Sequence, residues 1–148
     1  MSKLDLSKLP WNQGSTYPAV FAAAVRTRQW QRLGEPAGLT QFGVNLVRLP
    51  PGAWSSQRHW HTEEDEFIYV VDGELVLITD SGEQIMRAGD CAAFKGGVGD
   101  GHHLQNRSTQ PAHFLAVGSR IASDICHYPD IDMVAGPSGA TRKDGTPY

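Results

Sequence analysis

Turn-forming residues divide the central part of the chain, residues 39–118, into short apolar runs. Turn signals recur at short intervals, at Pro50-Pro51-Gly52, Asp72-Gly73, Ser81-Gly82, Ala88-Gly89 and Gly96-Gly97. The runs between them are rich in residues that favour strands, as in 67–71, 75–79 and 114–117. Short strands separated by such closely spaced turns are typical of an all-β sandwich or barrel. No stretch shows a sustained helical period, so we expect an all-β fold.

Individual segments support more local predictions. Asp72-Gly73 stands between two apolar runs and predicts a hairpin, because both turn positions require positive φ. Residues 19–33 suit either a short helix or a strand, and Val20, Phe21 and Val25 favour the strand.

The two ends of the chain differ in composition from its centre. Residues 1–18 and 135–148 are rich in Pro, Gly, Ser and Thr, which indicates extended arms or irregular tails. A length of 148 residues suits one domain. We therefore expect an N-terminal arm over 1–38, a barrel core over 39–118 and an irregular C-terminal extension over 119–148.

The composition gives no reason to expect a nucleic-acid or membrane partner. The chain has 13 Lys and Arg against 16 Asp and Glu, for a net charge of −3, and its arginines are scattered as on a solvated surface. The longest apolar run of the N-terminal region, 19–25, is too short to span a membrane. Cys91 and Cys126 fit no disulfide framework, which favours a reducing compartment and a cytoplasmic location.

The segment His59-Trp60-His61 is the clearest candidate for chemistry. Residues i and i+2 of a strand point to the same face, so His59 and His61 can converge on one ion, and Gln57 shares their face. Two histidines with one carboxylate are the donor set of many metal sites that keep positions open. Glu66 is the preferred carboxylate, because it directly precedes an apolar strand, and Asp65 is the alternative.

A second histidine pair, His102-His103, follows a glycine-rich loop. Adjacent strand residues face opposite ways, so only one of the two can join an inward site. Asn45 shares a strand face with Val47 and Leu49, and an inward amide there can orient a substrate or satisfy a local hydrogen bond. The same two readings apply to Gln57. We retain Asn45 and Gln57 as candidate substrate contacts.

Two runs of residues resemble the two motifs of the cupin superfamily. The first is Gly52…His59-x-His61-x4-Glu66-x6-Gly73, and the second is Gly89-x5-Lys95-x-Gly97…His102-x3-Asn106. The resemblance covers roughly 40–118. It implies a jelly-roll β-barrel whose interior holds one divalent metal ion, such as zinc, manganese, iron or nickel. Carried over by position, the ligands are His59, His61, Glu66 and His102.

The sequence departs from the cupin pattern in its loops. Six residues rather than five separate Gly52 from His59, Lys95 stands where the family usually has proline, and the loop before His102 is longer than usual. A shift of register in that loop would make His103 the fourth ligand instead.

The resemblance also implies a function and an assembly. The sequence is similar to small single-domain bacterial cupins, a few of which are named sugar-phosphate isomerases, and it implies a homodimer in which 1–38 is exchanged. Open positions on the metal would bind a small oxygenated metabolite, and Glu66 would serve as a base. We expect a metal-dependent isomerase or lyase. The alternatives are an iron- or copper-dependent dioxygenase and a non-catalytic binding or sensor module.

Overall fold

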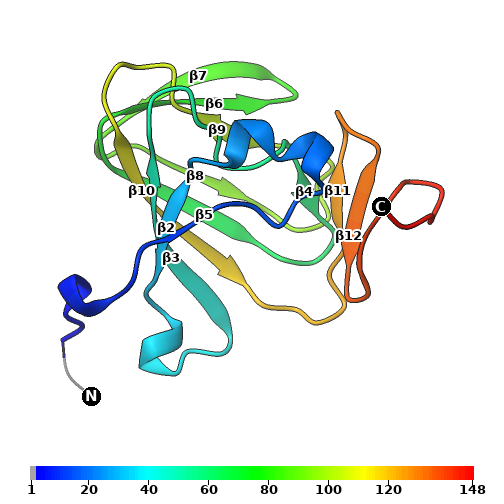
Figure 1. Ribbon diagram of the computed structural model, residues 1–148, viewed down its shortest axis with the longest axis horizontal. Coiled ribbons are helices and arrows are strands. Elements are labelled where there is room, and N and C mark those ends of the chain that lie inside the picture. Colours follow the sequence, from blue (N-terminus) through cyan, green and yellow to red (C-terminus); the bar gives the residue numbers. More distant parts are fainter. Residues whose placement is uncertain (1–2) are drawn as a thin grey trace.

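A computed structural model describes residues 3–148, so the first two residues of the expected N-terminal arm lie outside the described part. Three sheets make up the fold (Figure 1). The largest has the order β1-β2-β3-β10-β5-β8, with bounds Asn12–Gln13, Gln29–Arg32, Phe42–Leu49, Ala112–Ser119, Glu66–Asp72 and Cys91–Phe94. The second has the order β7-β6-β9, with bounds Gly82–Arg87, Glu74–Thr79 and His103–Gln105. The prediction of an all-β barrel is confirmed.

The third sheet joins the C-terminal part of the chain to the histidine segment. Its order is β13-β12-β11-β4, with bounds Gly139–Thr141, Met133–Gly136, Cys126–Tyr128 and Trp60–His61. The prediction of an irregular tail over 119–148 is therefore incomplete, because three short strands form within this segment. These strands pair over long distances in sequence: Cys126 lies opposite His61, and His127 lies opposite Trp60. The C-terminal extension thus holds the histidine segment in place.

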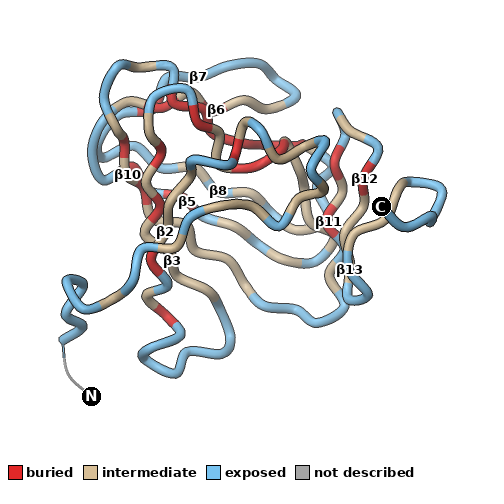
Figure 2. Tube along the Cα trace, viewed as in Figure 1, coloured by how far each residue is buried: buried red, intermediate tan, exposed pale blue. Residues whose placement is uncertain are grey.

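Strand alternation builds the core between the sheets. On β5, Ile68 and Val70 are buried, whereas Phe67, Tyr69 and Val71 are 40–44% exposed on the outer face. The buried cluster includes Leu49, Leu75 and Phe114, and Figure 2 shows the buried positions concentrated where the sheets face each other. Each fully buried side chain of this size contributes about 1.5–3 kcal/mol relative to exposure.

The turn at Asp72-Gly73 is a corner between sheets, so the hairpin predicted there was wrong. β5 pairs with β10 and β8, whereas β6 pairs with β7 and β9. Gly73 has φ +78°, and a Cβ there would lie 2.6 Å from the Cβ of Ala112. Only glycine fits where the chain passes this closely from one sheet to the next. The hairpin instead joins β6 to β7.

The N-terminal segment contains four short 3-10 helices as well as strands. Their bounds are Leu6–Lys8 (η1), Ala19–Phe21 (η2), Ala23–Val25 (η3) and Glu35–Ala37 (η4). The strand predicted over 19–33 forms only at β2, which pairs with β3. Val20 is 72% exposed and Val25 is fully buried, so the apolar residues of 19–25 do not share one strand face. In Figure 1 this blue segment runs across the near side of the barrel.

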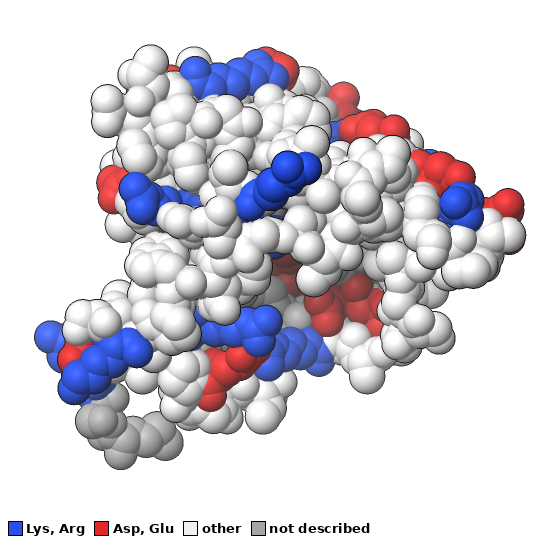
Figure 3. Space-filling model, in the orientation of Figure 1, with Lys and Arg blue, Asp and Glu red and all other residues white. Residues whose placement is uncertain are grey.

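The surface carries charges of both signs. On the face seen in Figure 3, basic and acidic side chains are interspersed around a hollow, and no continuous basic patch is visible. The helices formed by residues 3–148 include none with the length and hydropathy of a membrane-spanning segment.

Candidate metal centre

Three histidines converge on one carboxylate inside the barrel. The Nε2 atoms of His102, His59 and His61 lie 2.7, 3.3 and 3.7 Å from Oε2 of Glu66. His61 belongs to β4 and Glu66 begins β5, while His59 and His102 bridge each other through two backbone hydrogen bonds of 3.1 and 2.8 Å. The structure therefore brings together all four ligands that the sequence predicted.

Hydrogen bonds at Nδ1 orient two of the three imidazoles. Nδ1 of His59 lies 3.0 Å from the carbonyl oxygen of Gln57, and Nδ1 of His61 lies 2.6 Å from Oδ2 of Asp124. A carbonyl and a carboxylate only accept, so each Nδ1 carries a proton, which leaves Nε2 as the nitrogen that can bind a metal ion. This is the tautomer that a metal ligand requires.

Ring packing, rather than a hydrogen bond at Nδ1, orients the third imidazole. The ring of His102 stacks on Phe94, with centroids 3.5 Å apart and planes 1° from parallel. Its buried Nδ1 has no protein partner among the described residues. The stack therefore directs Nε2 of His102 at Glu66.

Asp124 organises the turn that follows His61. Its Oδ1 accepts hydrogen bonds from the amides of Glu63 and Glu64, at 2.8 and 3.2 Å, and from the hydroxyl of Thr62 at 3.2 Å. The four polar residues between His61 and Glu66 thus form a turn around one buried carboxylate. Asp124 was not predicted, because nothing near it in sequence marks a contact 63 residues away.

The alternative ligands lie elsewhere. Asp65 is exposed, and its Oδ1 accepts a hydrogen bond from the amide of Gly96 at 2.8 Å. Nδ1 of His103 is bound to the carbonyl of Ser56 at 3.0 Å, and its ring packs edge-on against Trp54. Asp65 and His103 therefore support neighbouring loops.

The electrostatics of the cluster favour a charged carboxylate. Burial alone would raise the pKa of Glu66, but hydrogen bonds from His102 and His59 outweigh it and hold that pKa well below its usual value. Burial lowers the pKa of His102, against the attraction of Glu66. For His59 the attraction of Glu66 prevails over burial and the pKa is raised.

The residues present fit a divalent metal ion. Donor atoms of His59, Glu66 and His102 lie within 4.8 Å of one another. His61 belongs to two further groups of this kind, one with His59 and Cys126 and one with Glu64 and Asp124. Three imidazoles beside one carboxylate form a donor set that suits zinc, iron, manganese or nickel, and the donor set alone does not select among them.

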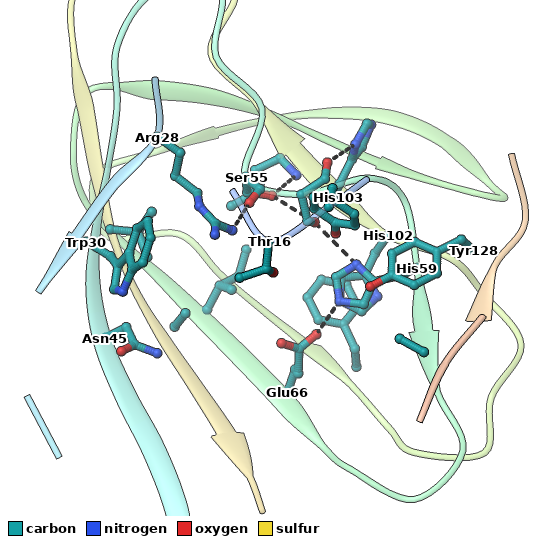
Figure 4. A pocket seen from close by; sticks show the side chains of 18 of the residues that line it. Thr16, Arg28, Trp30, Asn45, Ser55, His59, Glu66, His102, His103 and Tyr128 are labelled. Carbon is teal, nitrogen blue, oxygen red and sulfur yellow. Dashed lines mark hydrogen bonds and ion pairs between the residues drawn. The ribbon is translucent and has the colours of Figure 1, made fainter. Parts of the chain in front are cut away.

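A cavity of about 600 Å³ opens beside this cluster, within the range of small-molecule sites (Figure 4). Its apolar wall includes Val47, Ile68, Leu77, Leu104 and Phe114. Its polar lining includes Thr16, Arg28, Asn45, Ser55 and Ser56. Such walls can hold a small organic ligand against the metal ligands.

The two predicted substrate contacts lie in different places. Asn45 lines the cavity, in line with the sequence analysis. Gln57 is not among the lining residues: its Nε2 donates to the carbonyl of Phe21 at 2.7 Å, and its amide donates to the hydroxyl of Tyr17 at 3.2 Å. Gln57 therefore fastens the N-terminal segment to the barrel.

Residues outside the barrel core also line the cavity. Arg28 and Trp30 come from the N-terminal segment, and Tyr128 and Met133 come from the C-terminal sheet. The sequence analysis placed Arg28 on a solvated surface, whereas the structure shows it half-buried in this wall. No local pattern signals these positions, since pairing between distant segments creates them.

The barrel and its cluster of three histidines and one glutamate define a cupin. The model of the Cupin domain family (Cupin_2) matches residues 45–118, and the chain belongs to this family. That range contains all four predicted metal ligands.

Three known proteins match the chain over most of its length. A solved structure from Silicibacter pomeroyi, described as a sugar phosphate isomerase from a cupin superfamily, is 50% identical, with a TM-score of 0.94 over 99% of this chain and 96% of that one. The tetracenomycin polyketide synthase protein TcmJ of Streptomyces glaucescens is 30% identical over 73% of this chain and 71% of its own length. The polyketide cyclase RemF of Streptomyces resistomycificus is 20% identical, with a TM-score of 0.65 over 80% and 79% of the two chains, and it shows the fold alone.

Proposed function

We propose that the protein is a metal-dependent enzyme that acts on a small oxygenated metabolite by isomerase- or lyase-type chemistry. The observation that carries the proposal is the convergence of His59, His61 and His102 on Glu66 at the edge of the cavity. A divalent ion held there supplies Lewis acidity, which stabilises negative charge on a substrate oxygen. The name of the relative from Silicibacter pomeroyi, a sugar phosphate isomerase, supports this class of reaction.

Glu66 is the proposed proton carrier. Among the described residues that line the cavity it is the only carboxylate, so a proton moved there by an acidic side chain passes through its oxygens. Its lowered pKa keeps it charged at neutral pH, ready to accept a proton. The amide of Asn45, on β3 of the same sheet as Glu66, lines the cavity and can donate to or accept from a substrate hydroxyl or carbonyl.

Metal analysis of protein purified without added metal is the first test. We expect about one divalent ion per chain, and its loss in the double variant His59→Ala, His61→Ala. Zinc, manganese or nickel without oxygen uptake supports the isomerase or lyase proposal. Iron or copper with oxygen uptake would replace it with a dioxygenase. A protein without stoichiometric metal would leave a binding module.

Proton transfer can be measured without knowing the natural substrate. The metal-loaded protein is incubated in D2O with a panel of α-hydroxy ketones and aldose phosphates, and NMR follows exchange of the hydrogen next to the carbonyl. We expect exchange with at least one compound, lost in Glu66→Gln and kept in the control Glu63→Gln, an exposed neighbour of the same type. Equal exchange in both variants would remove Glu66 from its proposed role.

A further inference from the structure

The cavity contains a second cationic group, away from the metal ligands. Figure 4 shows Arg28, Trp30 and Asn45 on one side of the cavity, and His59, His102 and Glu66 on the other. Arg28 precedes β2 and lies over the face of Trp30, with its guanidinium carbon 4.9 Å from the ring centroid. One Nη of Arg28 donates to the carbonyl of Ser55.

This charge has no carboxylate to balance it. Among the described residues, five other arginines form ion pairs with acids, namely Arg32, Arg58, Arg87, Arg107 and Arg120. Arg28 has no such pair, and its Nε is buried without a hydrogen-bond partner. A half-buried guanidinium with unused donors is costly unless an anion or water completes its shell.

The cavity as a whole is therefore suited to anions. Its lining contains one carboxylate, Glu66, against the guanidinium of Arg28, and the proposed divalent ion would leave a net positive charge. Two tyrosines that line the cavity with Arg28, Tyr17 and Tyr128, have raised pKa values because burial disfavours their anionic forms, so at neutral pH they are uncharged. Nothing else in the lining neutralises the guanidinium.

We propose that Arg28 binds an oxyanion of the substrate, a carboxylate or phosphate group, while the oxygenated part of the same molecule faces the metal ligands. A guanidinium recognises such groups through paired hydrogen bonds from its planar fork. The ring of Trp30 packs against the guanidinium of Arg28 and restricts its orientation. This assignment rests on the proposed function, since it places the substrate between Arg28 and the metal cluster, and it names the class of substrate: a small anionic metabolite.

The test is anion binding by calorimetry at about pH 8. Inorganic phosphate and malonate serve as probes, each with chelator-treated and with zinc-loaded protein. We expect at least one probe to bind. We expect Arg28→Gln to weaken that binding by roughly tenfold or more, because a charge-assisted pair of hydrogen bonds is lost. A preference for phosphate or for malonate identifies which oxyanion the site takes.

Arg48→Gln is the matched control. Arg48 is also half-buried, its Nε is also buried without a partner, and it is not among the residues lining the cavity. We expect it to leave anion binding unchanged. Arg28→Lys keeps the positive charge but loses the paired donors of the guanidinium, so this variant should bind the anion with intermediate affinity. It provides the comparison if Arg28→Gln does not fold.

Two outcomes would overturn the proposal. The first is a wild-type protein that binds neither probe at millimolar concentration. The second is equal binding by wild type and the Arg28 variants, or an equal loss in Arg48→Gln. The chelator-treated arm separates this proposal from the metal proposal: a chain that holds no metal can still show Arg28-dependent binding, and a metal-loaded chain can lack it.

Discussion

Replacing Asp124 with asparagine should weaken metal binding without removing a ligand. Oδ1 of Asp124 accepts three hydrogen bonds from the turn after His61, so an asparagine would keep its oxygen there and turn Nδ2 towards the imidazole. Oδ2 now lies 2.6 Å from Nδ1 of His61. An amide nitrogen at that place can only donate, so Nδ1 must give up its proton and Nε2 must take it. The metal then loses a lone pair.

The size of the effect follows from that change of tautomer. Burial raises the pKa of Asp124, but the contacts with His61 and the two amides prevail and lower it, so the carboxylate is charged at neutral pH. Loss of such a partner to a metal-bound histidine costs about 10- to 100-fold in affinity, which is about 1.4–2.8 kcal/mol. Competition with a chromogenic chelator for zinc measures this directly.

A control separates this effect from a loss of charge alone. Asp130 also pairs with a cation, through hydrogen bonds of 2.7 and 2.8 Å from Arg58, but its side chain is 55% exposed and it is not among the lining residues of the cavity. Asp130→Asn should leave zinc affinity within about twofold of wild type. The reasoning is refuted if Asp124→Asn also stays within that range while chemical denaturation shows both variants folded.

Three further predictions concern the barrel, its thiols and its assembly. Gly73→Ala should lower the midpoint of urea unfolding much more than Gly52→Ala does. Both glycines have φ near +80°, but only a Cβ at position 73 meets Ala112, and this overpacking costs about 1–3 kcal/mol. Equal midpoints for the two variants would contradict the clash. Burial raises the pKa of Cys126 to about 12, so iodoacetamide at about pH 8 should label the exposed Cys91 much faster in the folded protein, as read by mass spectrometry; similar rates would be inconsistent with that pKa. We propose a homodimer, because β5 presents Phe67, Tyr69 and Val71 on an outer face, so sizing chromatography at micromolar concentration should give twice the chain mass, and a monomer would count against it.

The sequence predicted the residues of the candidate metal site, because the positions of three of them depend on local geometry. Strand parity places His59 and His61 on one face, and the start of β5 places Glu66 beside them. The choice of His102 over His103 came from the cupin motif, and the structure places His102 against Glu66.

The parts that were missed depend on contacts between distant segments. The sequence Asp72-Gly73 is compatible both with a hairpin and with a corner between two sheets. The pairing of β6 with β9 shows that it forms the corner. Asp124 reaches His61, and Arg28 reaches the cavity, from outside the apolar strands, so no periodicity marks them. A single sequence shows hydrophobic periodicity and motif spacing, whereas tertiary packing determines the positions of these residues.

The walls of the cavity have a separate origin from the metal ligands. The ligands lie within 45–118, whereas Arg28, Trp30, Tyr128 and Met133 belong to the flanking segments. Substitutions at these four wall positions can therefore change ligand preference while the candidate metal ligands stay in place. Grafting these wall residues from one cupin onto another is a route to transferring selectivity, provided that Asp124, which also lies in a flank and orients His61, is kept.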